Sequence, residues 1–298
     1  MKKDPKPIGT GLYTRYREAI DMSLYTQTRD EGAVSSAAKI QYGYEKDLTI
    51  KQETLELSVT KLMRDGGKDQ EIKDIVSMLS EVVPNAIELD LSHRLTFMFA
   101  TSYADRSGKT IDTTAGDGFA LVYTAQTLTG SATTYNNNVT GNPQFSKGAL
   151  ESALKQSVEE TYSNLGEKFT MNFDTVFCSL DPNTNNQIDE LFKATADVTS
   201  NNANTFNVYQ NRMRKVAIPL LATTATGATD TTKAKYWGIA STQNSSFYYS
   251  ELSAPYMKSP TDGNNGEDFS SENWNYLVGV SYGIVVPGAR WIRASKGD

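Results

Sequence analysis

The sequence predicts an α+β fold organised on one long helix, and three observations lead to this fold class. First, apolar residues recur at spacings of three and four between Asp69 and Thr101, which is the pattern of one helix face. Second, strand-like alternation precedes this stretch, and third, short apolar strands follow it. The helix would be about 50 Å long at 1.5 Å per residue, so we expect a spine and not one layer of a bundle. Asp69 is the expected N-cap, and Pro84 is expected to bend the helix without ending it.

Two segments precede the predicted spine. Residues 1–32 are interpreted as an N-terminal arm with an extended start and a short helical patch at residues 13–26. Residues 33–67 are predicted to form an extended hairpin loop, with strands at 34–44 and 48–63 joined by a charged turn at Glu45-Lys46-Asp47. Lysines are spread along this hairpin, so it should reach into solvent and need another surface to lie on, because an isolated hairpin is only marginally stable. We therefore expect inter-subunit contacts at Tyr44, Glu45, Lys46, Asp47 and Lys51.

Short elements follow the spine. Ser146 should cap a helix over residues 147–162, and Asp181 followed by Pro182 should open another that runs to about Ala194. The predicted strands are Phe119–Tyr123, Met171–Leu180, Met213–Leu221 and Lys235–Ser241, with further strands in 276–297.

Composition excludes several classes of function. Charged residues make up 21% of the 298 residues and the net charge is -6, so overall charge does not indicate a nucleic-acid-binding protein. The 16 tyrosines and 11 phenylalanines fit large contact surfaces, and an ordinary antiparallel globule accounts for them equally well. With one cysteine, Cys178, and one histidine, His93, the chain cannot form an internal disulfide or a Cys/His zinc cluster. Cys178 is interpreted as a core residue, and His93 as structural or solvent-facing.

No cofactor, metal or membrane is expected. Residues 181–192 resemble a calcium loop but have Asn186 where glycine is needed and Phe192 where glutamate is needed. No stretch approaches the roughly 20 apolar residues of a membrane span, and no secretory signal is present, so we expect a soluble protein made in a reducing cytoplasm.

The order of these elements resembles the major capsid protein of tailed bacteriophages, which has the Hong Kong 97-type shell fold. The resemblance rests on the Asp117-Gly118 pair before an apolar strand, an Asn-rich loop, the capped helices and the C-terminal strands, and it covers the chain from about Gly32. It implies an extended loop at residues 33–67 lying over a neighbour, a peripheral domain of 68–165 and 256–298 with the spine, and an axial domain of 166–255. A His-Pro pair found in many relatives is replaced here by Ala125-Gln126-Thr127.

The resemblance also implies partners. Copies of the chain would form hexamers and pentamers of an icosahedral head around double-stranded DNA, assembled in the host cytoplasm with a portal and a separate scaffolding protein. Two basic clusters, one at Arg212, Arg214 and Lys215 and one at Arg290, Arg293 and Lys296, could touch DNA or pair with acids of a neighbour. Pairing with acids of a neighbouring subunit is favoured over contact with DNA because the chain as a whole is acidic. An encapsulin-type cargo shell, or a soluble hydrolase with an unrecognised site, remain the alternatives.

Overall fold

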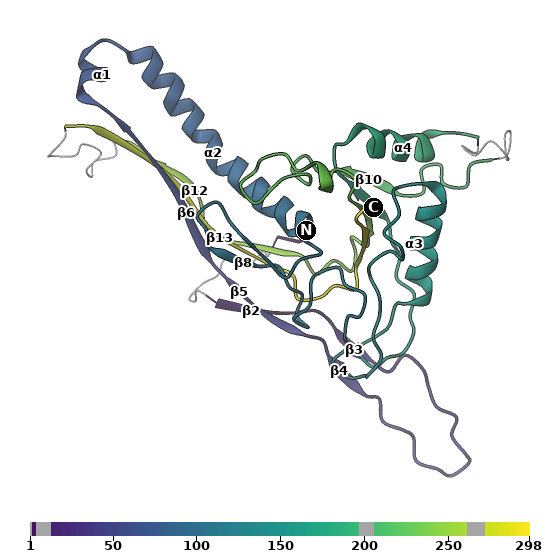
Figure 1. The fold of residues 1–298 in the computed structure, drawn as a ribbon. Helices are drawn as coiled ribbons and strands as arrows, with labels where there is room; N and C mark the ends of the chain where they lie inside the picture. Colours follow the sequence, from purple (N-terminus) through teal and green to yellow (C-terminus); the bar gives the residue numbers. More distant parts are fainter. Residues whose placement is uncertain (1, 4–12, 197–205, 261–271) are drawn as a thin grey trace.

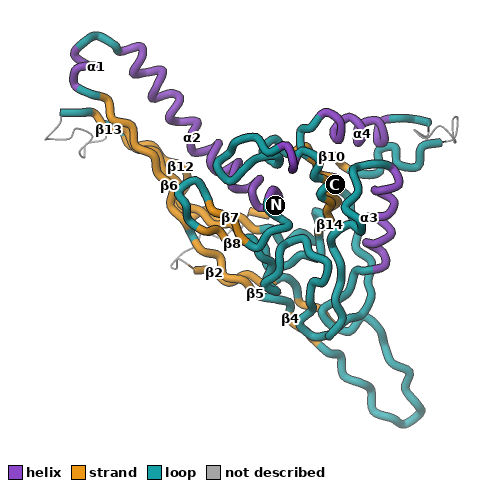
Figure 2. Tube along the Cα trace, viewed as in Figure 1, coloured by secondary structure: helices purple, strands orange, loops and turns teal. Residues whose placement is uncertain are grey.

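The computed structural model describes residues 2–3, 13–196, 206–260 and 272–298, and the chain has an elongated outline (Figure 1). A narrow extension holds the longest helix beside long strands, a broader body carries shorter helices, and a loop projects from the body (Figure 2). The helices are α1 (Lys61–Asp65), α2 (Asp69–Thr96), α3 (Lys147–Glu159) and α4 (Pro182–Lys193), with a 3-10 turn at Thr231–Lys233. The strands in the first half are β1 (Lys2–Lys3), β2 (Tyr13–Arg17), β3 (Ile20–Met22), β4 (Ile40–Tyr42), β5 (Glu45–Thr49), β6 (Lys51–Val59), β7 (Ser102–Ala104) and β8 (Thr110–Asp112). Those in the second half are β9 (Thr175–Cys178), β10 (Arg214–Ala217), β11 (Trp237–Ala240), β12 (Tyr248–Lys258), β13 (Trp274–Val285) and β14 (Ile292–Ser295).

The predicted spine is helix α2, and it runs through Pro84 without ending, as expected. Two details differ from the prediction. The N-cap is Lys68, with Asp69 in the first turn, and the helix ends at Thr96, five residues early. The Thr96 hydroxyl donates a hydrogen bond of 2.9 Å to the Leu221 carbonyl, so tertiary contacts fix this end of the helix.

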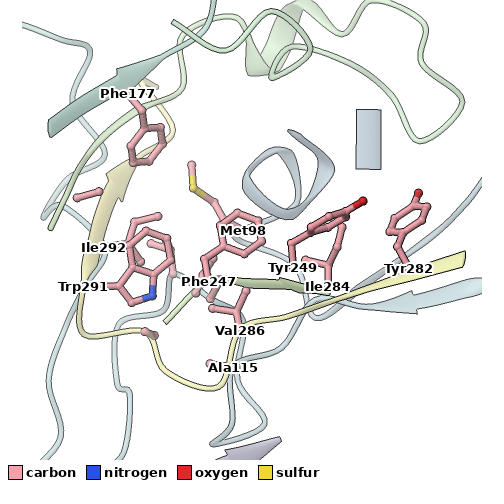
Figure 3. Close-up of a cluster of buried hydrophobic side chains, with 14 of the residues drawn as sticks. Met98, Ala115, Phe177, Phe247, Tyr249, Tyr282, Ile284, Val286, Trp291 and Ile292 are labelled. Atoms are coloured by element: carbon pink, nitrogen blue, oxygen red, sulfur yellow. The ribbon is translucent and has the colours of Figure 1, made fainter. Parts of the chain in front are cut away.

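The first core cluster joins α2 to a four-stranded sheet of order β1-β12-β13-β6. Strand β13 is antiparallel to both β12 and β6. Leu79 and Val83 of the helix belong to the same buried cluster as Val278, Val280 and Tyr282 of β13. Figure 3 shows how the cluster continues toward the body, with further aromatic and aliphatic side chains gathered below the helix.

The second core cluster lies in the body. Its sheet has the order β10-β9-β11-β14, in which β9 is parallel to β10 and antiparallel to β11. Helices α3 and α4 contribute buried residues to this cluster, among them Leu150 and Ile188. Both predicted caps are confirmed, because the Ser146 side chain accepts from the Ala149 amide and the Asp181 side chain accepts from the Thr184 amide. Helix α3 therefore packs with the strands of the body, although the expected domain limits grouped it with the spine.

The hairpin differs most from the sequence expectation. The predicted turn at Glu45–Asp47 is wrong, because these residues lie within β5. The predicted helical patch at 13–26 is also wrong, since this segment forms β2 and β3, which pair with β5 and β4 in antiparallel register. The hairpin therefore runs from Tyr13 to Thr49, and its loop is residues 23–39.

A smaller difference concerns the predicted strand Phe119–Tyr123. Within that segment the backbone makes an isolated bridge between Ala120 and Thr114 and is otherwise bent or irregular. The Gln126 side chain satisfies two of its carbonyls, those of Ala120 and Leu121, by donating to them. A neighbouring strand is therefore not needed to pair these groups.

Candidate inter-subunit surface

One face of the β3–β4 ribbon carries apolar side chains that the chain itself leaves uncovered. The cross-strand pairs Ile20–Tyr42 and Met22–Ile40 are all more than half exposed. Directly opposite residues of a ribbon share a face, so these four side chains form one apolar strip. Beyond the ribbon the loop continues this exposure, and Val34 is 93% exposed. Contiguous exposed apolar surface of this kind is typical of contact sites between proteins.

The opposite face of the hairpin is fixed to the body by a buried ionic cluster, which we call the hinge cluster: Glu18, Asp21 and Arg290. The Arg290 guanidinium donates to Glu18 at 2.7 Å and to Asp21 at 2.9 Å. The side chains of Arg290 and Glu18 are 7% and 8% exposed. Burial opposes the charged form of Arg290, but the two carboxylates outweigh it, so the pKa of Arg290 lies above its usual value. The hinge cluster thus anchors the base of the hairpin to the C-terminal part of the chain.

The four residues predicted around the turn lie in or beside β5 and mostly have partners within the chain. Tyr44 shares a hydrogen bond of 2.8 Å with the Thr127 hydroxyl. Asp47 accepts from Arg15 at 2.8 Å across the β2–β5 pair, and Glu45 pairs with Arg17 in the same way. Glu45 and Asp47 are therefore held at the exposed side of the hairpin by arginines of β2.

Lys46 and Lys51 point into the molecule. The Lys46 ammonium lies 2.8 Å from Asp112, and burial lowers the pKa of Lys46. Lys51 pairs with Asp90 of α2 and lies 2.8 Å from Glu53. Burial lowers the pKa of Lys51 as well, and the Tyr282 hydroxyl completes the cluster by donating to Asp90 at 2.5 Å. Both lysines are thereby committed to contacts that join the hairpin and β6 to the rest of the chain.

The two basic clusters have different positions. Arg212 and Arg214 are exposed at the start of β10, where the Arg212 guanidinium lies 5.5 Å from the Tyr209 ring centroid. Arg293 is buried, donates to the Glu160 carbonyl at 3.0 Å, and has its pKa lowered to about 10 by burial. The expectation that the C-terminal cluster faces DNA or a neighbour is therefore wrong for Arg290 and Arg293. Their side chains serve as internal donors instead.

His93 and Cys178 both have structural positions. The His93 ring is 1% exposed and lies 3.1 Å from the Thr224 carbonyl, and burial lowers its pKa to about 4. Cys178 is fully buried, and burial raises the pKa of its thiol to about 11. A neutral thiol at that pKa is a poor nucleophile. Within the described ranges no three His, Cys, Asp or Glu side chains are grouped to hold a metal ion.

Sequence reasoning missed Glu18 and Asp21, because the segment that carries them was interpreted as an arm with a helical patch. An alternating pattern was nevertheless available from Thr14 to Arg17, and the structure shows these residues alternately half-buried and exposed. Such a period of two would have indicated a strand.

Comparisons with known proteins identify the fold. No protein-family model matches the sequence, and no curated protein matches it significantly. Among solved structures, a chain of "Capsid of Ralstonia phage GP4" is 10% identical, with a TM-score of 0.54 over 96% of this chain and 82% of that one. A chain of "The capsid of Myoviridae Phage XM1" is 9% identical, with a TM-score of 0.52 over 96% of this chain and 86% of that one. A chain from "Gordonia phage Cozz" is 13% identical, with a TM-score of 0.52 over 98% and 83%.

This chain therefore has the fold of bacteriophage capsid chains, in an α+β arrangement. The resemblance stated from the sequence is confirmed at the level of the fold. In the described part of the chain, no helix has both the length and the apolar character of a membrane span.

Proposed function

We propose that this chain is a major capsid protein, with a structural and not a catalytic role. Many copies form hexamers and pentamers that close into the icosahedral head of a phage. The observation that carries the proposal is the likeness to chains from two structures described as phage capsids, which extends over 96% of this chain in each case. A head of this kind is made in the bacterial host and becomes part of the virion.

The projecting hairpin supports the proposal independently of the comparisons. A loop that exposes Val34 and an apolar ribbon face gains nothing in an isolated subunit, since exposed apolar area is unfavourable in water. In a ring of identical subunits, each hairpin covers its apolar strip against the next copy, and such heterologous contacts close into rings. The contact residues in this proposal are the strip and loop residues, with Tyr44, Glu45 and Asp47 at the base and Arg212 and Arg214 on the body.

The two core clusters suggest the division into domains. The peripheral domain contains α2 with β6, β12 and β13, whose Leu79, Val83 and Val280 pack in the first cluster. The first cluster also extends to Ile292 and Ala294 of β14, but β14 pairs with β11 and is therefore grouped with the sheet of the body. The axial domain contains α4 with the sheet β10-β9-β11-β14, and α3 joins it because Leu150 and Ala153 pack in the second cluster. This moves the proposed boundary so that α3 and β14 belong to the axial domain.

Double-stranded DNA, a portal and a separate scaffolding protein are the further partners in this proposal. The net charge of -6 suits a lining that does not hold its genome tightly, because affinity for DNA arises chiefly from lysine and arginine contacts to phosphate. Contacts with DNA are expected to be non-specific and confined to exposed cations such as Arg212 and Arg214.

The test is expression of the chain followed by size-exclusion chromatography and electron microscopy. The wild type should form capsomers or closed particles of megadalton mass. The double variant Ile20→Ser/Ile40→Ser removes apolar surface from the strip and should shift the protein toward free subunits of unchanged circular dichroism. The matched control Val158→Ser, on the exposed face of α3 at 57% exposure, should assemble as the wild type does. A wild type found only as a small oligomer would refute the proposed function.

A further inference from the structure

A cavity of about 230 Å³ lies where α2, the base of the hairpin and the β7–β8 pair meet. Six charged side chains line it: Lys46, Lys51, Arg94, Lys109, Asp47 and Asp112. Four of these are cations and two are carboxylates. The excess of positive charge makes the cavity a candidate site for an anionic group.

The ion pairs of the lining leave two cations over. Lys46 is paired with Asp112, and Lys51 with Asp90 and Glu53. Asp47 is held by Arg15 on the outer side of the hairpin. Among the described residues, neither Arg94 nor Lys109 forms a salt bridge.

Arg94 is the more informative of the two. One terminal nitrogen donates to the Asp112 backbone carbonyl, but the Nε atom is buried and has no hydrogen-bond partner. Burial of the guanidinium lowers the pKa of Arg94, and nearby groups, Asp112 among them, offset this effect only in part. The Nε atom is closed off from solvent, so an incoming carboxylate would meet a terminal nitrogen of the guanidinium instead. It would compensate the poorly solvated charge through a charge-assisted hydrogen bond.

The hairpin loop carries the complementary groups. Asp30 and Glu31 are exposed at a turn in which the Ala33 amide donates to the Asp30 carbonyl, and neither side chain forms a salt bridge in the described part of the chain. In Figure 1 the loop projects away from β5 and β8, so it does not approach its own cavity. Glu31 lies six positions after Tyr25, whose hydroxyl donates to the Lys168 carbonyl, and six positions give a reach of about 20 Å beyond the body.

We propose that the cavity beside Arg94 and Lys109 receives the carboxylates of Asp30 and Glu31 from the hairpin loop of a second copy of this chain. The inference rests on the proposed function, because it needs identical subunits arranged so that each loop reaches the next. It adds a specific electrostatic contact to the apolar strip. It would also give a salt-bridge partner to Arg94 in the last turn of α2.

A charge exchange tests the contact on the full chain. Lys109→Glu and Glu31→Lys each place like charges together, so each should raise the protein concentration needed for half-assembly about tenfold, which corresponds to about 1.4 kcal/mol. The double variant restores opposite charges and should assemble within about threefold of the wild type. Lys155→Glu and Glu190→Lys, both exposed on the helices of the body, are the matched controls and should leave assembly unchanged. Light scattering across a concentration series measures the effect, and Arg94 is left unaltered so that folding is not at risk.

Each outcome decides the question. Rescue of assembly by the double variant supports the contact. The contact is overturned if the two single variants weaken assembly additively in the double variant, or if neither weakens assembly at all. Inorganic phosphate is added to dissociated wild-type subunits as a further probe. A phosphate-dependent rise in melting temperature without charge-exchange rescue would mean that the cavity takes a free anion, which also overturns the proposal. A wild type that never assembles would remove both this contact and the proposed function, whereas an assembling wild type without rescue removes only the contact.

Discussion

Replacing Arg290 by methionine should release the hairpin from the body. The substitution keeps a long side chain but leaves the buried carboxylates of Glu18 and Asp21 without their cation. Removing one partner of a buried ion pair costs about 3–5 kcal/mol, because the remaining charge stays desolvated. The Glu18 amide bonds the Tyr44 carbonyl at 2.9 Å and the Gly43 amide bonds the Ala19 carbonyl at 2.7 Å, so the loss should appear as local opening at these amides.

Hydrogen exchange on dissociated subunits measures that opening, with peptides covering 13–22 and 40–49. A loss of 3–5 kcal/mol should speed exchange there by at least about a hundredfold, since each 1.4 kcal/mol is a factor of ten. Peptides from β9 and β11 should exchange as in the wild type. The triple variant Arg290→Met/Glu18→Gln/Asp21→Asn should regain most of the protection, because neutral amides cost less to bury than unpaired charges.

The matched control is Arg214→Met, in which an exposed arginine is changed in the same way. It should leave exchange at the hairpin unaltered. Unchanged exchange at the hairpin of Arg290→Met would show that the hinge cluster does not hold it. Equal acceleration in β9 and β11 would also refute the reasoning, because it would indicate global unfolding.

Three further predictions follow from the core, the loop and His93. Leu79→Asp places a charge in the first core cluster, where Leu79 is 5% exposed, and should abolish soluble expression; a melting temperature near that of the wild type would show that this face of α2 is not buried. Replacing residues 26–38 by a short glycine-serine turn should leave circular dichroism unchanged while sedimentation shows loss of particles, and loss of both signals would make the loop part of the subunit fold. The folded-state pKa of His93 is about 4, against 6.5 for the free side chain. Between these two pH values the unfolded state binds a proton that the folded state does not bind. The free energy of unfolding therefore falls as the pH drops, by up to about 3 kcal/mol. Urea titrations of wild type and His93→Gln at pH 7 and 4 should show a smaller loss in the variant, and equal losses would contradict the assignment.

The parts of the fold that were predicted correctly are those with local causes. The spine helix follows from apolar spacing within 28 residues, and the caps Ser146 and Asp181 act on amides three residues away. The hairpin was misplaced because its register depends on pairs such as Arg15–Asp47, which are 32 residues apart in sequence. Three consecutive charged or polar residues at Glu45–Asp47 indicate a turn locally, yet arginines of β2 pair with two of them, and Lys46 turns inward to Asp112.

The candidate contact residues illustrate the same limit. A lysine in a polar strand has the same local sequence pattern whether it faces solvent or a buried carboxylate. Lys46 and Lys51 were therefore expected to contact a neighbouring subunit, whereas in the structure they pair with Asp112 and Asp90 of the same chain. In the sequence, Arg290 and Arg293 look like a basic tail. In the structure, Arg290 pairs with Glu18 in the hinge cluster, and Arg293 donates to the Asn136 carbonyl. The fold class required only the order of the elements. The contact surface required knowledge of which charges are already paired.

The distribution of those pairs predicts which part of the hairpin can adapt to different neighbours. In the proposed shell a subunit would occur in both hexamers and pentamers and would meet the next copy at different angles. Rotating the hairpin at its base would break the two contacts that Arg290 makes with it, to Glu18 and Asp21, and would cost about 3–5 kcal/mol in every subunit. Bending the loop between Thr26 and Ala38 breaks no ion pair in the described part of the chain, and every residue of this segment is exposed. We therefore expect the base to keep one direction in all positions of a shell and the loop to take up the differences in angle.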